Sequence, residues 1–107
     1  MIQFQFKYWF EHGGGCIWGV NTIAKEKYGY CINFNTLPIS KELVLLLVQL
    51  EKEYYTYLDW EYPPNPSPWS EELKKDFVKR ATDAYNDLCE ELGENYIVEN
   101  AMSSCVY

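Results

Sequence analysis

The sequence predicts an α+β fold. In it a small antiparallel sheet, made by an amino-terminal hairpin and a carboxy-terminal strand, is covered on one face by an antiparallel pair of long helices. Apolar and polar residues alternate over residues 2–11. Two stretches, at 40–58 and 70–92, carry apolar residues at helical spacing, and a short run, Tyr-Ile-Val-Glu, follows at 96–99. The 107 residues have the length of one domain, so we expect a single domain over residues 1–107.

The amino-terminal hairpin is predicted from period-two alternation. Apolar side chains occupy every second position from Ile2 to Phe10, and the positions between them are polar except for Trp9. This pattern is typical of a strand with one face on a core and the other toward water. The glycines at 13–15 permit a reversal, and residues 16–20 supply a second short strand.

A short helix and a loop follow the hairpin. Asn21 or Thr22 can cap a helix over residues 23–28, and Gly29 can end it in the left-handed conformation. Residues 30–40 combine a brief alternation with asparagines and a proline, and we interpret them as a loop.

Two long helices complete the predicted helical layer. Ser40 and Ser70 are suited to cap their first turns, and Gly93 can end the second helix. The apolar stripe of the first helix is wider than one packing face needs, so this helix is either sandwiched or partly presented to a partner. The run at 96–99 predicts a last strand, and we expect the tail from Asn100 to fray.

Composition restricts the function classes. The chain has 16 acidic and 9 basic residues and a net charge of −7, which disfavours binding to nucleic acid or anionic membranes. The first residues lack the pattern of a signal peptide, and the longest apolar run, 43–48, is far shorter than the ~20 residues that span a bilayer. We therefore expect a soluble, cytoplasmic protein.

No catalytic, cofactor or metal site is predicted. The four cysteines, Cys16, Cys31, Cys89 and Cys105, are widely spaced, and we expect reduced thiols that act as small core residues. His12 could meet Cys16 across the hairpin, but no orienting group for such a pair is visible. The glycine run lacks the lysine of a phosphate-binding loop. We therefore expect a protein that is not an enzyme.

The carboxy-terminal part of the chain carries an unusual charge pattern. From Asp83 onward there are six acids and no lysine or arginine. Acids in the last turns of a helix oppose its dipole, which suggests a function in binding. The alternative is a solvated acidic face kept for solubility. The partner-binding candidates, called here the acidic flank, are Asp83, Asp87, Glu90, Glu91 and Glu94.

The proline-rich segment at 59–69 is a second candidate binding site. It carries Trp60, Glu61, Tyr62 and Trp69 on a backbone stiffened by four prolines, and rigid aromatic side chains lose little entropy on binding. The alternative is a clasp in which the two tryptophans fold back over the helix ends.

Two motifs carry a resemblance, FEHGGGCIW at 10–18 and LDWEYPPNPSPW at 58–69. They resemble a group of small uncharacterised bacterial proteins over roughly residues 4–93. In size, acidity and lack of catalytic groups the chain is similar to immunity proteins of bacterial toxin systems, including contact-dependent growth inhibition. That likeness raises the expectation of an immunity protein and assigns a role to no residue.

The leading hypothesis is a cytoplasmic immunity protein or antitoxin that neutralises a basic toxin domain, with a nuclease as the first choice. A nuclease holds phosphates with lysine and arginine, and an acidic protein can occupy that site. One alternative is a small-molecule or peptide-binding module with a cleft lined by Trp9, Trp18, Trp60 and Trp69. Another is a structural subunit. The oligomeric state stays open.

Overall fold

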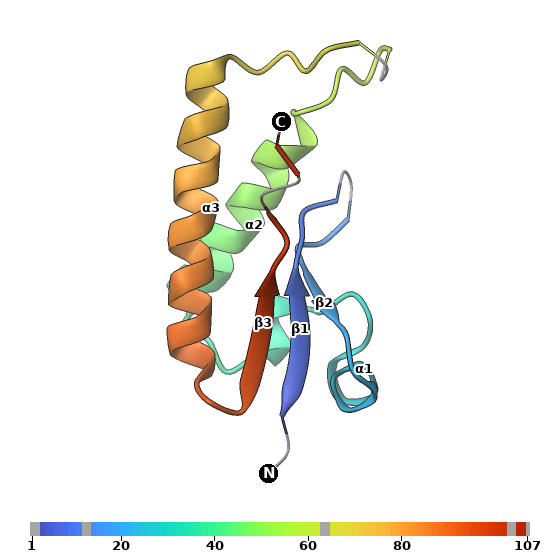
Figure 1. Ribbon diagram of the computed structural model, residues 1–107, viewed down its shortest axis with the longest axis vertical. Coiled ribbons are helices and arrows are strands. Elements are labelled where there is room, and N and C mark those ends of the chain that lie inside the picture. The colour runs from blue at the N-terminus through green and yellow to red at the C-terminus, as the bar shows by residue number, and fades with distance from the viewer. Residues whose placement is uncertain (1–2, 12–13, 63–64, 103–104, 107) are drawn as a thin grey trace.

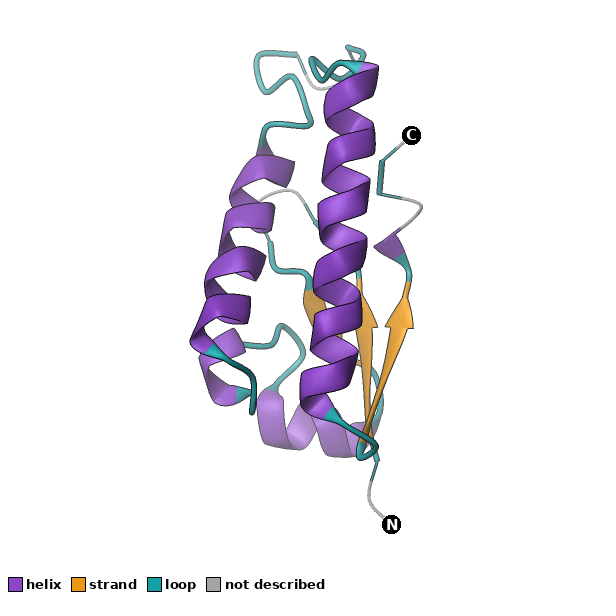
Figure 2. Ribbon diagram, turned by 90° about the vertical axis from the view of Figure 1, so that its left-hand side faces the viewer, coloured by secondary structure: helices purple, strands orange, loops and turns teal. Residues whose placement is uncertain are grey.

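The computed structural model describes residues 3–11, 14–62, 65–102 and 105–106. It has a layer of helices against a three-stranded sheet, and the α+β prediction is confirmed (Figure 2). The elements, in chain order, are β1 (Phe4–Tyr8), β2 (Ile17–Gly19), α1 (Thr22–Tyr28), a single 3-10 turn (Phe34–Thr36), α2 (Lys41–Tyr55), α3 (Glu71–Leu92) and β3 (Tyr96–Asn100).

The two long helices form an antiparallel pair. In Figure 1, α2 and α3 run in opposite directions side by side, with the proline-rich segment joining them at the top. Figure 2 shows this pair on one side of the sheet. None of the helices in the described parts of the chain is both long enough and apolar enough to cross a bilayer.

The sheet differs from the prediction in the direction of its last strand. Its order is β2-β1-β3. The hairpin partners β1 and β2 are antiparallel, as predicted, but β3 runs parallel to β1, with Phe4 opposite Tyr96. The Phe4 N–H donates to the Asn95 carbonyl (2.9 Å), so the chain leaves α3 at the end of the sheet where β1 begins. Alternation records which residues face the core and carries no information on strand direction.

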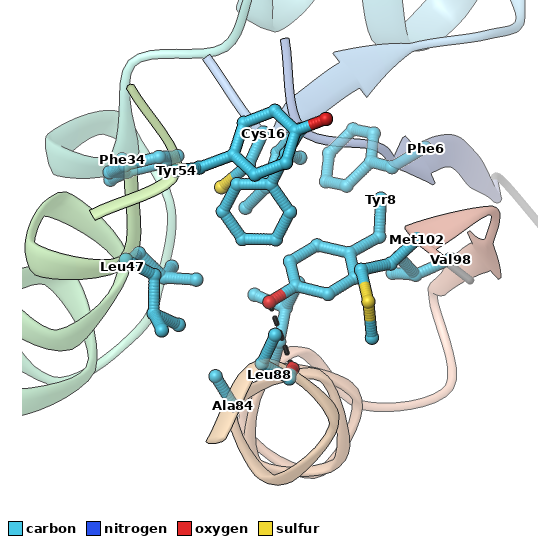
Figure 3. Close-up of a cluster of buried hydrophobic side chains, with 14 of the residues drawn as sticks. Phe6, Tyr8, Cys16, Phe34, Leu47, Tyr54, Ala84, Leu88, Val98 and Met102 are labelled. Carbon is cyan, nitrogen blue, oxygen red and sulfur yellow. Dashed lines mark hydrogen bonds between the residues drawn. The ribbon is translucent and has the colours of Figure 1, made fainter. Parts of the chain in front are cut away.

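The core lies between the sheet and the helix pair. Phe6, Tyr8 and Phe10 point into it and are almost fully buried, whereas Gln5, just before them, is exposed. The Tyr8 hydroxyl crosses the core and donates to the Ala81 carbonyl of α3 (2.9 Å), which satisfies a polar group at the centre of the apolar cluster (Figure 3). The one-sided strand predicted from the alternation is therefore present.

The predicted capping residues are confirmed. The side chains of Asn21, Ser40 and Ser70 accept hydrogen bonds from the first turns of α1, α2 and α3. Gly29 and Gly93 end α1 and α3 with φ values of 88° and 83°, a region that residues with a Cβ atom rarely adopt.

The carboxy-terminal tail is packed, contrary to the expectation that it frays from Asn100. Met102 and Cys105 are buried, and the Tyr54 hydroxyl of α2 donates to the Cys105 carbonyl (2.7 Å). Burial of these apolar side chains stabilises the tail beyond the end of β3.

Candidate functional site

The acidic flank lies on the exposed surface of α3 and just beyond it. Asp83, Asp87 and Glu90 are spaced by four and three residues, so they share one side of the helix. All five acids of the flank are exposed. Within the described parts of the chain, none of the five has an ion pair. The structure therefore presents a strip of uncompensated negative charge.

Glu91 differs from the other members of the flank because it contacts α2. Its carboxylate accepts hydrogen bonds from the Ser40 N–H and from the Ser40 hydroxyl (3.1 Å), and the same hydroxyl accepts from Leu43 N–H. In the antiparallel pair, the end of α3 lies beside the positive start of α2. Glu91 opposes the dipole of its own helix, but its hydrogen bonds to Ser40 at the start of α2 give it a structural role.

Arg80 marks the border between the flank and α2. Its guanidinium donates to both carboxylate oxygens of Glu53 on α2 (2.6 Å each) and to Asp76 one turn earlier (2.9 Å). The hydrogen bonds from Arg80 lower the pKa of Glu53. Because Arg80 is shared between two acids, it leaves the neighbouring flank negative.

The proline-rich segment lies at the end of the helix pair opposite the last turn of α3 (Figure 1), and two of its aromatic side chains are exposed. Trp60 stacks on Tyr55 of α2 with ring centroids 4.6 Å apart, and its indole N–H donates to the Tyr55 carbonyl. Trp60 is 45 % exposed and Tyr62 is 59 % exposed, and Glu61 lies between them on the surface. The structure brings these three candidates together but separates them from the acidic flank.

Trp69 lies in the core, contrary to its choice as a surface anchor. It is 7 % exposed, packs against Tyr57 and Phe77, and donates its indole N–H to the Thr56 hydroxyl (2.8 Å). A bulky aromatic ring gains more from burial between two helices than from exposure. The clasp interpretation therefore describes Trp69.

Two of the four tryptophans line a common pocket. Trp9 and Trp18 border a pocket of about 380 Å³ on the face of the sheet away from the helix pair, and Lys7 lies over the Trp9 ring (4.7 Å). Trp60 and Trp69, though described by the structure, do not line it. The expected four-tryptophan cleft is thus reduced to a pair.

The structure has a groove beside Glu51 that was not predicted from the sequence. Glu51 projects from α2 into two adjoining pockets of about 390 and 280 Å³, which share Gly14 and Val48. Burial raises the pKa of Glu51 to about 7. A sequence signal existed, because Glu51 follows Val44 and Val48 at helical spacing and so falls on an apolar side of α2.

The cysteines are free. Cys16 and Cys105 are buried, as expected of core residues, and Cys89 is half-buried, but Cys31 is exposed. No group of three metal-ligating side chains occurs among the residues that the structure describes.

Comparison with known families now adds to this geometry. The sequence model of the Serratia CdiI immunity protein-like family matches residues 6–102. No curated protein matches the chain significantly. The matched range contains most of the hairpin, both long helices and the acidic flank. It confirms the resemblance to immunity proteins of contact-dependent growth inhibition. The chain belongs to the Serratia CdiI immunity protein-like family.

Proposed function

We propose that this chain neutralises its cognate CdiA toxin domain by covering a basic surface of that domain with the acidic flank. Membership in a CdiI immunity family implies a cognate CdiA toxin as the partner. The single observation that supports the use of the flank is its exposure without compensating ion pairs among the described residues. Unpaired surface carboxylates give long-range attraction to a basic partner.

The proposed toxin is a nuclease. Enzymes of this class need lysine and arginine to hold the phosphates of their substrate, and carboxylates can take the place of those phosphates. Electrostatic steering raises association rates well above those of neutral pairs. Fast capture suits an inhibitor that must act before the toxin turns over. Immunity proteins act by binding, so we propose that the chain itself has no catalytic role. We also propose that it acts in the cytoplasm.

The proposed test measures toxin affinity at two salt concentrations. The toxin domain encoded beside the gene is titrated with wild-type chain, with Asp87→Asn/Glu90→Gln, and with a control, Glu26→Gln/Glu99→Gln, that removes the same charge elsewhere. The flank variant should bind more weakly and with a shallower salt dependence, and the control should resemble wild type. Association that does not weaken as salt rises would contradict the proposal. Cleavage of nucleic acid by the free toxin domain tests its class.

A second candidate function rests on the pocket between Trp9 and Trp18. Its volume of about 380 Å³ lies in the range of small-molecule sites, and Lys7 and Lys25 lie over aromatic rings beside it. Two lysines and one acid, Glu11, line this pocket, so its net positive charge favours a small anion or an acidic peptide. Quenching of tryptophan fluorescence by such compounds, lost in Lys7→Gln, tests this function.

A further inference from the structure

The groove beside Glu51 joins the two sequence motifs of the chain. It is lined by Gly14 and Gly15 of the first motif and by Tyr55, on which Trp60 of the second motif stacks. Gly15 lies close to Cys31 and Glu51. A Cβ atom added at Gly15 would lie 3.0 Å from the Cys31 sulfur and 3.7 Å from Glu51 Oε2. The absence of a side chain at Gly15 leaves space beside the Glu51 carboxylate.

The Glu51 carboxylate has no partner within the described parts of the chain. No hydrogen bond or ion pair reaches it there, and Lys52, the adjacent residue, does not pair with it. Neighbours in a helix point to different sides. The groove around it is lined by apolar side chains such as Val44 and Val48, by Cys31, and by Lys52, which does not pair with it. A half-buried, unpaired carboxylate is unfavourable for folding, and this cost indicates a role in binding.

We propose that this groove receives an arginine side chain of the toxin, whose guanidinium pairs with Glu51 and whose stem lies along Val48 and Tyr55. This inference rests on the proposed function. A guanidinium binds a carboxylate through two parallel hydrogen bonds and also packs on aromatic rings, which the flexible ammonium of lysine does less well. A single carboxylate does not provide the several oxygen ligands that a divalent cation needs.

The groove and the acidic flank can contact the same toxin domain. Glu53 pairs with Arg80 on the side of α2 that faces α3, whereas Glu51 faces the glycine turn on the other side. An α-helix is about 10–12 Å across, and a protein interface commonly covers about 800 Å² on each partner. Leu45, on the exposed surface of α2, is 61 % exposed, so an apolar side chain is available to this interface.

The first experiment needs no toxin. N-acetyl-L-arginine amide is titrated into ¹⁵N-labelled wild-type chain, with uncharged N-acetyl-L-norleucine amide as the matched compound. The arginine compound should shift the amide signals of Gly14, Gly15 and Tyr55, and the norleucine compound should not. In Glu51→Gln these shifts should disappear, and in the control Glu26→Gln they should persist. Equal shifts with both compounds, or in Glu51→Gln, overturn the inference.

The second experiment uses the toxin domain. Glu51→Gln should weaken toxin binding about thirtyfold or more, while Glu26→Gln leaves it unchanged and both variants melt cooperatively. If Glu51→Gln binds as tightly as wild type while the acidic-flank variant binds weakly, the groove inference fails and the proposed function stands. If the wild-type chain does not bind the toxin, the proposed function fails, and the arginine titration still decides whether the groove accepts a guanidinium.

Discussion

The two sides of α2 carry glutamates that differ in their surroundings. Glu53 faces α3 and holds Arg80 through two hydrogen bonds of 2.6 Å, which lower its pKa. Glu51, two residues earlier, faces Gly14 and Gly15 with no partner among the described residues, and burial raises its pKa to about 7. On one side of α2 the glutamate carboxylate thus has a partner inside the fold, and on the other side it has none among the described residues.

The difference separates structural acids from candidate binding acids. A carboxylate with an internal partner contributes to stability and has little capacity left for another protein. A carboxylate without one gains more from a cationic partner, because burial has already removed part of its water. The same comparison holds on α3, where Glu91 bonds to Ser40 and the exposed Glu90 has no ion pair among the described residues.

The largest expected effect comes from removing the ion pair between Arg80 and Glu53. Arg80→Ala should destabilise the fold by about 1–2 kcal/mol, because it leaves the partly buried Glu53 without its cationic donor. Because pairing lowers the pKa of Glu53, the ion pair stabilises the fold at pH values above the pKa of Glu53 in the unfolded chain. This stabilisation is lost as the pH falls through the pKa of Glu53 in the folded chain. Urea unfolding of wild type and Arg80→Ala at pH 7 and pH 3 measures this, and an equal difference at both pH values contradicts it.

A smaller effect distinguishes the two adjacent acids at the end of α3. Glu91→Gln should destabilise by about 1 kcal/mol, since an amide offers only one acceptor to the two donors of Ser40. Glu90→Gln should leave stability unchanged or slightly raised, because it removes a charge that opposes the helix dipole. Thermal melts of both variants provide the test. If the two variants melt alike, the contact of Glu91 with Ser40 does not stabilise the fold.

Local patterns predicted the elements but not the contacts that join them. The alternation at Phe6, Tyr8 and Phe10 predicted which side of β1 is buried, since that information lies within neighbouring residues. The contact between Glu91 and Ser40 joins residues 51 positions apart, and no local pattern encodes such a pairing. The parallel direction of β3 and the groove beside Glu51 depend likewise on how distant elements pack.

The smallest expected effect concerns Glu51 and the way its carboxylate makes the stability of the fold depend on pH. The folded pKa of Glu51, about 7, lies above its ordinary value of 4.5, so the folded state binds its proton more tightly. The wild-type chain should therefore lose stability as the pH rises from about 4.5 to about 7, whereas Glu51→Gln should not show this loss.

The melting temperature of Glu51→Gln minus that of wild type should thus be near zero at pH 4.5 and positive at pH 8. The corresponding difference in the free energy of unfolding at pH 8 should be about 0.5 kcal/mol, because solvent screens a half-exposed group. The groups that face Glu51 are the thiols of Cys16 and Cys31, with Lys52 beside it on α2, and they are common to both proteins. Burial raises the pKa of Cys16 well above its usual value, so this thiol stays neutral in the window. A difference that does not grow between pH 4.5 and pH 8 would show that the Glu51 carboxylate is well hydrated, and the comparison between the two sides of α2 would then fail.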